Sequence, residues 1–222
     1  MQTLSRWEHA LTFFPQFRAA LEEHIGSDAT VLVIGASDGR LVLPLTAAGH
    51  RVTAIERDPI ALQGGLVRLP DGTEAHAAGL VERLQQEGLT DRVDIVDGDF
   101  LNVGLPADVQ YDAVWTSCSW HYSANHHRPL ADFVTRMQDL VRVRGLFGAE
   151  FMMPVTARHH LSEHYTSPER LSPLFSDGWN VQLTLRSGQY VERPHIGQPH
   201  PHTHRMGLFL ATRTSPMTSE RA

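Results

Sequence analysis

The sequence contains no lysine, and all 19 of its basic residues are arginine. This absence excludes several mechanisms at once. A P-loop places a lysine on the phosphates of its nucleotide, pyridoxal enzymes and Schiff-base aldolases form an imine with a lysine amine, and some reductases pair a tyrosine with a lysine. These exclusions hold whatever the reason for which arginine has replaced lysine.

Cysteine and long apolar runs are also scarce. Cys118 is the single cysteine, which excludes an internal disulfide and a zinc site built from several cysteines. No stretch of about 18 apolar residues is present, and the segment MQTLSRWEHALTFF lacks the basic and apolar regions of a signal peptide. We therefore expect a cytoplasmic protein without a membrane partner.

An excess of positive charge is missing as well. The formal net charge is -6 and the isoelectric point is near 6.1, so no global positive field would attract nucleic acid. The sequence has neither a basic stripe nor regularly spaced aromatic residues on which bases could stack. These observations favour a small-molecule substrate and predict no nucleic-acid partner.

Apolar runs of strand length alternate with segments of helical period, a pattern typical of a parallel sheet covered on both faces. The expected strands lie near 30–34, 51–56, 92–97, 111–117, 145–153, 180–188 and 206–213. The expected helices span 39–49, 77–88 and 128–142. A loop, rather than a helix, joins the last two strands, so we expect these strands to be antiparallel. The fold class is therefore α/β, with a seven-stranded mixed sheet.

The chain is expected to form one globular domain over 28–213, preceded by a helical cap (1–27) and followed by a flexible polar tail (214–222). A helix over roughly 5–25 would carry an apolar stripe of Trp7, Leu11, Phe14, Phe17 and Leu21. An insertion near 65–77, LVRLPDGTEAH, alternates around Pro-Asp-Gly and predicts a β-hairpin. That hairpin either covers the ligand site or pairs with a second copy of the chain in a homodimer.

The stretch VLVIGASDGR predicts a ligand site, because a buried strand ends there in a turn of small residues. Open α/β sheets bind ligands beyond the carboxyl ends of their strands. Glu56 ends the second strand, where an acidic side chain can accept hydrogen bonds from ribose hydroxyls, whereas Asp58 suits the N-cap of the next helix. Asp99 and Phe100 follow the third strand and offer an acceptor and an apolar plate to an adenine ring.

These features in this order, with YDAVWTS and RVRGLFGAEFMMP as the next strands, resemble the class I S-adenosylmethionine-dependent methyltransferases over about residues 28–213. The resemblance implies a Rossmann-like sheet with an antiparallel last strand, S-adenosyl-L-methionine as cofactor and methyl transfer as the reaction. It implies a cofactor-binding set of Gly35, Ala36, Ser37, Asp38, Gly39, Glu56, Arg57, Asp99, Phe100, Ser117 and Cys118. The sequence departs from the family at Val33, where an acidic residue is common, and at Ser37, where glycine is common.

Catalytic candidates lie in TSCSWHYSANHHRPL, which follows the fourth strand. A sulfonium methyl needs an in-line nucleophile held close to it, and a base only if that nucleophile arrives protonated. We expect His121 as the general base, with Tyr122 and His126 as further candidates. The segment lacks the Asn/Asp-Pro-Pro-Tyr motif, which argues against DNA adenine as the acceptor. Oxygen, nitrogen, sulfur and carbon acceptors all stay open.

Histidines also concentrate in ERPHIGQPHPHTHR, between the last two strands. His195, His200, His202 and His204 are residue types that bind metal ions, and His160 and His164 stand one helical turn apart. A proline-rich loop sets no fixed ligand geometry, however. We therefore predict no metal site, and a loop that either binds the substrate or closes over it.

Two other functions are consistent with parts of the sequence. IGASDGRLV also resembles the first turn of the short-chain dehydrogenases, which are nicotinamide-dependent oxidoreductases. Those enzymes use a catalytic tyrosine paired with a lysine, and this sequence has no lysine. A noncatalytic cofactor-binding module would keep the same fold. Arg128, Arg158 and Arg170 would each either bind a substrate carboxylate or lie on the surface.

Overall fold

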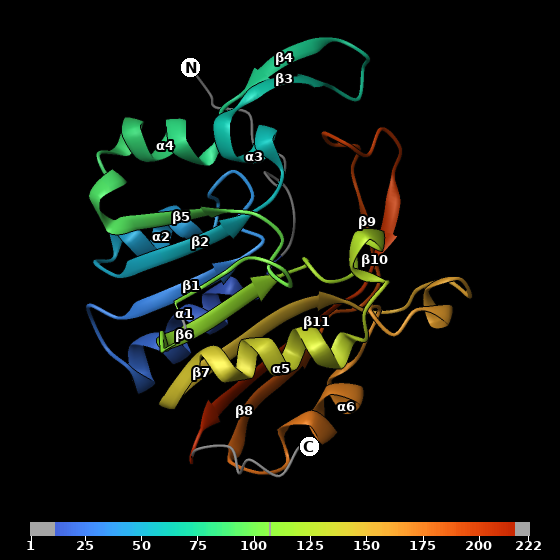
Figure 1. The fold of residues 1–222 in the computed structure, drawn as a ribbon. Helices are drawn as coiled ribbons and strands as arrows, with labels where there is room; N and C mark the ends of the chain where they lie inside the picture. The colour runs from blue at the N-terminus through green and yellow to red at the C-terminus, as the bar shows by residue number, and fades with distance from the viewer. Residues whose placement is uncertain (1–11, 107, 216–222) are drawn as a thin grey trace.

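The computed structural model describes residues 12–106 and 108–215, and its centre is a seven-stranded sheet in the order β5-β2-β1-β6-β7-β11-β8 (Figure 1). The strands are β1 (Thr30–Ile34), β2 (Arg51–Glu56), β5 (Val93–Asp97), β6 (Tyr111–Ser117), β7 (Val141–Met152), β8 (Trp179–Arg186) and β11 (Met206–Arg213). β5, β2, β1, β6 and β7 are parallel, whereas β11 is antiparallel to both β7 and β8. The predicted fold class is confirmed.

Helices cover both faces of this sheet, because the central strands are apolar on both sides. Val31 and Val33 of β1 belong to one buried cluster, and Leu32 and Ile34 belong to the other. The first cluster includes residues of α1 (Phe14–His24), α2 (Val42–Ala47), α3 (Pro59–Gln63) and α4 (Leu80–Glu87). The second includes residues of α5 (Leu130–Leu140) and α6 (Pro168–Leu171). No helix in the described ranges is long and apolar enough to cross a membrane.

The N-terminal helix packs directly on the sheet. The Phe17 ring stacks on Trp115 of β6 with a centroid separation of 4.4 Å. Glycine is required at position 148, since a Cβ atom there would lie 2.6 Å from Phe17 and 2.7 Å from Trp115. Phe14, Phe17 and Leu21 are buried as the predicted stripe requires, whereas Trp7 and Leu11 lie outside the described residues.

Several boundaries differ from the prediction. α1 begins at Phe14 rather than near residue 5, since Thr12 and Phe13 are not helical and Pro15 lies in the first turn. α4 begins at Leu80 rather than at 77, because Ala77 ends β4 (Glu74–Ala77). α2 begins at Val42 rather than at Gly39, whose positive φ of 89° is not helical. β7 begins at Val141, inside the segment expected to be helical, and is distorted near its start. Arg144 has a φ of 66°, and the pairing register shifts between Tyr111 and Ala113 opposite it. A bulged strand does not show regular alternation, so its beginning was not visible in the sequence.

Two small β-ribbons stand apart from the main sheet (Figure 1). The predicted hairpin is confirmed, with β3 (Gly65–Arg68) antiparallel to β4 (Glu74–Ala77). The second ribbon pairs β9 (Tyr190–Glu192) with β10 (His202–His204). The expected antiparallel pairing of β8 with β11 is confirmed, but part of the segment between them is an ordered ribbon rather than a loop.

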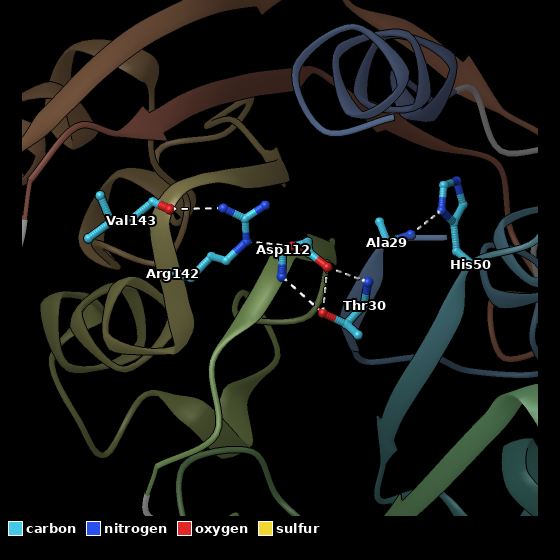
Figure 2. A network of polar contacts seen from close by, with 6 residues as sticks. All are labelled: Ala29, Thr30, His50, Asp112, Arg142 and Val143. Carbon is cyan, nitrogen blue, oxygen red and sulfur yellow. Dashed lines mark hydrogen bonds and ion pairs between the residues drawn. The ribbon is translucent and has the colours of Figure 1, made fainter. Parts of the chain in front are cut away.

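Asp112 joins three strands at their amino ends, as Figure 2 shows. Its Oδ2 atom accepts hydrogen bonds from the backbone N–H (2.7 Å) and the hydroxyl (2.8 Å) of Thr30, and its Oδ1 atom pairs with Arg142. Burial acts to raise the pKa of Asp112, but these hydrogen bonds outweigh it and the pKa is lowered. The carboxylate thus stabilises the sheet at the end opposite to the carboxyl ends of the strands.

Replacing Asp112 by alanine is expected to lower the free energy of unfolding by about 1.5–3 kcal/mol, because charged hydrogen bonds are lost and donors are left unpaired. Urea denaturation would measure this change. Asp177→Ala, at an exposed position, serves as the matched control and should change stability little. Equal midpoints for the two variants would show that the Asp112 contacts contribute no net stability.

Candidate active site

A cavity of about 260 Å³ lies at the carboxyl ends of β1, β2, β5 and β6. Its lining includes most of the predicted cofactor-binding set, namely Gly35, Ser37, Glu56, Arg57, Asp99, Phe100, Ser117 and Cys118. It also includes Asp58, Ser119 and Asn125, which sequence reasoning did not place there. The chain therefore brings these residues together from four strand ends, as the sequence predicted.

The first turn has the backbone geometry that a close ligand contact needs. Gly35 has a φ of 70°, and a Cβ atom there would lie 2.8 Å from Cβ of Ser119, so only glycine fits. Ser37 (φ 50°) and Cys118 (φ 52°) adopt the left-handed conformation that costs non-glycine residues energy. Such backbone strain clusters at functional sites, and both residues line this cavity.

Glu56 holds the turn in place through backbone hydrogen bonds. Its Oε2 atom accepts from the N–H of Ser37 (2.7 Å), and its Oε1 atom accepts from the N–H groups of Arg57 (2.8 Å) and Asp58 (2.9 Å). Because a carboxylate oxygen has two lone pairs, Oε2 can accept one more hydrogen bond at the cavity edge. The Asp58 side chain accepts from the N–H of Ile60 (2.9 Å), which confirms it as the N-cap of α3.

Asp99 and Phe100 form another wall of the cavity. Asp99 accepts hydrogen bonds from the N–H of Leu101 (3.1 Å) and from the Asn102 side chain (2.9 Å), which fix its orientation. The Phe100 ring is buried, with the guanidinium of Arg136 5.0 Å from the ring centroid. A fixed carboxylate therefore stands beside an apolar ring.

Two residues of the predicted cofactor-binding set, Asp38 and Gly39, line neither this cavity nor the second one that adjoins it. Asp38 is buried, and its Oδ2 atom lies 3.4 Å from the Arg83 guanidinium on α4. The space beside Gly39 is occupied by Leu80, which would lie 2.7 Å from an added Cβ. Both residues thus face α4, and the sequence did not reveal this direction. Ala36, which belongs to the same predicted set, lines the second cavity instead of the first.

This second cavity, of about 500 Å³, adjoins the first. Five residues line both: Gly35, Ser37, Ser117, Cys118 and Tyr122. The walls of the second cavity further include His121, Glu150, Tyr165, Tyr190, Glu192, His195, His202 and His204. The ribbon of β9 and β10, drawn at the end of the sheet toward which the parallel strands point (Figure 1), therefore forms one side of it.

His121 is not the ordinary imidazole that the sequence suggested. The residue keeps partial exposure, but its Nδ1 atom is buried and has no hydrogen-bond partner among the described residues. Burial, reinforced by neighbouring His204 and His126, lowers its pKa to about 3. The ring is therefore neutral near pH 7 and a weaker base than expected. Tyr122 lines both cavities, whereas His126 lines neither and stacks on His164.

Glu150 of β7 is a functional candidate that sequence reasoning missed. Its carboxylate is buried on the second cavity and accepts hydrogen bonds from Ser117 Oγ (2.8 Å) and Thr12 Oγ1 (2.7 Å). Burial raises the pKa of Glu150, although these hydrogen bonds oppose the shift. A single carboxylate within the apolar run LFGAEFMM was the available signal. Through these two hydrogen bonds Glu150 connects Thr12, just before α1, with Ser117, which lines both cavities.

None of the three arginines considered for substrate binding lines these cavities. Arg158 and Arg170 are exposed. Arg128 donates a hydrogen bond to Asn102 Oδ1 (3.1 Å). Of the two roles considered for these arginines, a position on the surface is better supported than binding of a substrate carboxylate.

Comparisons with known proteins agree with this geometry. No family model matches the chain. The 1,6-didemethyltoxoflavin-N1-methyltransferase of Burkholderia thailandensis, solved with S-adenosylhomocysteine, has a TM-score of 0.58 at 20% identity, over 91% of this chain and 78% of that one. The N-methyltransferase NodS of Bradyrhizobium japonicum gives 0.58 at 13% identity, over 91% and 94%. The fold is that of the class I S-adenosylmethionine-dependent methyltransferases.

One curated sequence also matches part of this chain. It is named "Probable ribosomal RNA small subunit methyltransferase A", from Haloarcula marismortui, and is 42% identical over 76 residues. The match covers 34% of this chain and only 21% of that protein. The resemblance seen in the sequence is thus confirmed at the level of the class I fold, and it places the 260 Å³ cavity where such sheets bind ligands.

Proposed function

We propose that this protein is an S-adenosylmethionine-dependent methyltransferase that acts on a small molecule. The observation that carries the proposal is the pair of adjoining cavities with a common wall of Ser37, Ser117, Cys118 and Tyr122. The cofactor would occupy the smaller cavity, with its ribose at Glu56 and its adenine between Asp99 and Phe100. The methyl group would then face the larger cavity, where the acceptor binds.

Proximity would supply most of the rate, since a sulfonium methyl needs only a nucleophile aligned behind it. A neutral His121 would act as a hydrogen-bond partner of the acceptor rather than as a strong base, because its pKa is about 3. Tyr122 borders both cavities and can orient the nucleophile. The acceptor itself can be an oxygen, nitrogen, sulfur or carbon atom.

A small molecule is favoured over RNA by the charges at the second cavity. Its walls carry the carboxylates of Glu150 and Glu192, and the chain has a net charge of -6. Phosphate backbones require neutralising cations for binding, and Arg40 is the one arginine among the residues that line this cavity. The name of the curated relative refers to ribosomal RNA, so RNA is the competing acceptor.

Calorimetric titration with S-adenosylmethionine and with NADPH tests the cofactor assignment. We expect saturable binding of S-adenosylmethionine and none of NADPH; the reverse result would support the oxidoreductase alternative. Turnover is then measured as S-adenosylhomocysteine formed with pooled small molecules and with ribosomal RNA. Formation with RNA alone would overturn the small-molecule proposal. Cofactor binding without turnover on either pool would favour a noncatalytic module.

A further inference from the structure

The ribbon of β9 and β10 gathers acidic and imidazole side chains at one place. Glu192 of β9 lies opposite His202 of β10 in the antiparallel register, and His204 follows two residues later. Directly paired residues, and residues two apart on a strand, share one face of a ribbon. The pleat therefore projects these three side chains together, and His195 approaches them from the turn after β9.

The nitrogen atoms converge on a single carboxylate oxygen. Glu192 Oε2 lies 2.7 Å from Nε2 of His204, 3.4 Å from Nε2 of His202 and 3.9 Å from Nε2 of His195. The ligand atoms of Glu192, His202 and His204 all lie within 4.8 Å of one another. Ligands of a tetrahedral zinc ion, with bonds of about 2.1 Å, are separated by about 3.4 Å. The distances from Glu192 Oε2 to the three histidines are shorter than this value for His204, equal to it for His202 and longer for His195.

The hydrogen bonds of the Nδ1 atoms are also compatible with metal binding. Nδ1 of His195 donates to the carbonyl of Ile196 (2.9 Å), and Nδ1 of His202 donates to the carbonyl of His200 (3.0 Å). In a neutral His202 ring this leaves a lone pair on Nε2 that is directed toward the Glu192 carboxylate, and either a proton on Nε2 or a metal cation between the two atoms removes the repulsion. Hydrogen bonds from the other ring nitrogen to carbonyls are the usual support of metal-bound histidines.

The group is also shielded and faces a cavity. The side chains of Glu192 and His204 are 8% and 12% exposed, and those of His195 and His202 are 15% and 24% exposed. All four line the second cavity. An ion held by Glu192, His202 and His204 alone would keep its fourth coordination position open toward that cavity, the arrangement that distinguishes catalytic from structural zinc sites.

We propose that Glu192, His202 and His204, assisted by His195, bind a divalent transition-metal ion of the zinc type. Imidazole ligands favour zinc and its neighbours over magnesium and calcium, which prefer oxygen ligands. The prediction of no metal depended on a loop without fixed geometry, and the β9–β10 pairing removes that premise. The site does not depend on the proposed methyl transfer, because its ligands are separate from the cofactor residues.

Metal titration tests this proposal without any assay of activity. Untagged protein, purified without a metal column and treated with a chelator, would be titrated with Zn²⁺ by calorimetry and with Co²⁺ by visible absorption. We expect one equivalent of each ion, and the strong visible bands of four- or five-coordinate cobalt. Magnesium in excess should not displace zinc. Absence of stoichiometric zinc uptake, or a cobalt spectrum like that of the hydrated ion, would overturn the proposal.

Variants then assign the ligands. Glu192→Gln and His204→Ala are each expected to weaken zinc binding at least 100-fold. His127→Ala is the control, since this exposed histidine lies outside the group, and it should bind zinc normally. Thermal melting of the metal-free proteins shows whether each variant is folded. A folded Glu192→Gln protein with unchanged zinc affinity contradicts the site; if that variant unfolds, a zinc-dependent rise in melting temperature of the unmodified protein still decides.

Discussion

Replacement of Glu56 by alanine is expected to weaken binding of S-adenosylmethionine by about 1.5–3 kcal/mol, or roughly 10- to 150-fold. Two losses combine in this effect. The ribose would lose a charged acceptor, and the turn at Ser37 would lose the carboxylate that fixes its N–H at 2.7 Å. Glu56 lies at a strand end and outside both buried apolar clusters, so the fold should persist.

Calorimetric titration of folded protein measures the change in affinity, and a melting curve measures stability separately. Glu87→Ala, an exposed change at the end of α4, is the control and should leave the affinity unchanged. Glu56→Gln keeps the size and one carbonyl acceptor, so it should give an intermediate affinity. If Glu56→Ala lowers only the melting temperature while folded molecules bind normally, the role of Glu56 is structural.

The sheet could be predicted because its strands have simple patterns. The central strands are short apolar runs bounded by turn residues, and a protein must bury such runs on both faces of a parallel sheet. The antiparallel β11 followed from the missing helix before it. The start of β7 could not be predicted, since its bulge at Arg144 depends on pairing with β6 rather than on local sequence.

The candidate cofactor site was predictable to a similar extent and for a similar reason. Residues at the carboxyl ends of parallel strands meet at one edge of the sheet, so Glu56 and Asp99 had to be neighbours. The direction of an individual side chain depends on its packing partners. Asp38 faces Arg83 on α4, and nothing near Asp38 in the sequence signals that contact.

The arrangement of the residues that line the second cavity could not be predicted from the sequence. Its histidines were recognised as a group, but their arrangement required the pairing of β9 with β10, strands of three residues each. Such short strands carry too little pattern to be identified. Glu150 was overlooked because its neighbours in β7 are apolar, and the pKa of His121 depends on burial that only the folded chain provides.

Acidification from pH 7 to pH 5 is expected to lower the free energy of unfolding by up to about 2 kcal/mol through His121 alone. The pKa of this histidine is about 3 in the folded protein, against 6.5 for the unperturbed side chain. Between these values the unfolded chain binds the proton and the folded chain does not, so stability falls as the pH falls. This contribution is complete above about pH 6.5 and decreases progressively toward pH 3. Burial lowers the pKa values of His159 and His164 in the same direction.

Urea denaturation at several pH values, with a chelator present so that no metal contributes, measures this dependence. His121→Asn should remove its share, so that the variant loses less stability than the unmodified protein over the same pH range. His127→Asn is the control, since His127 is exposed on the same segment, and it should keep the full dependence. His121→Phe provides a second variant if asparagine is poorly tolerated in the buried position. Parallel pH profiles for His121→Asn and His127→Asn would mean that the His121 imidazole is hydrated and titrates normally, which would restore it as a candidate general base near neutral pH.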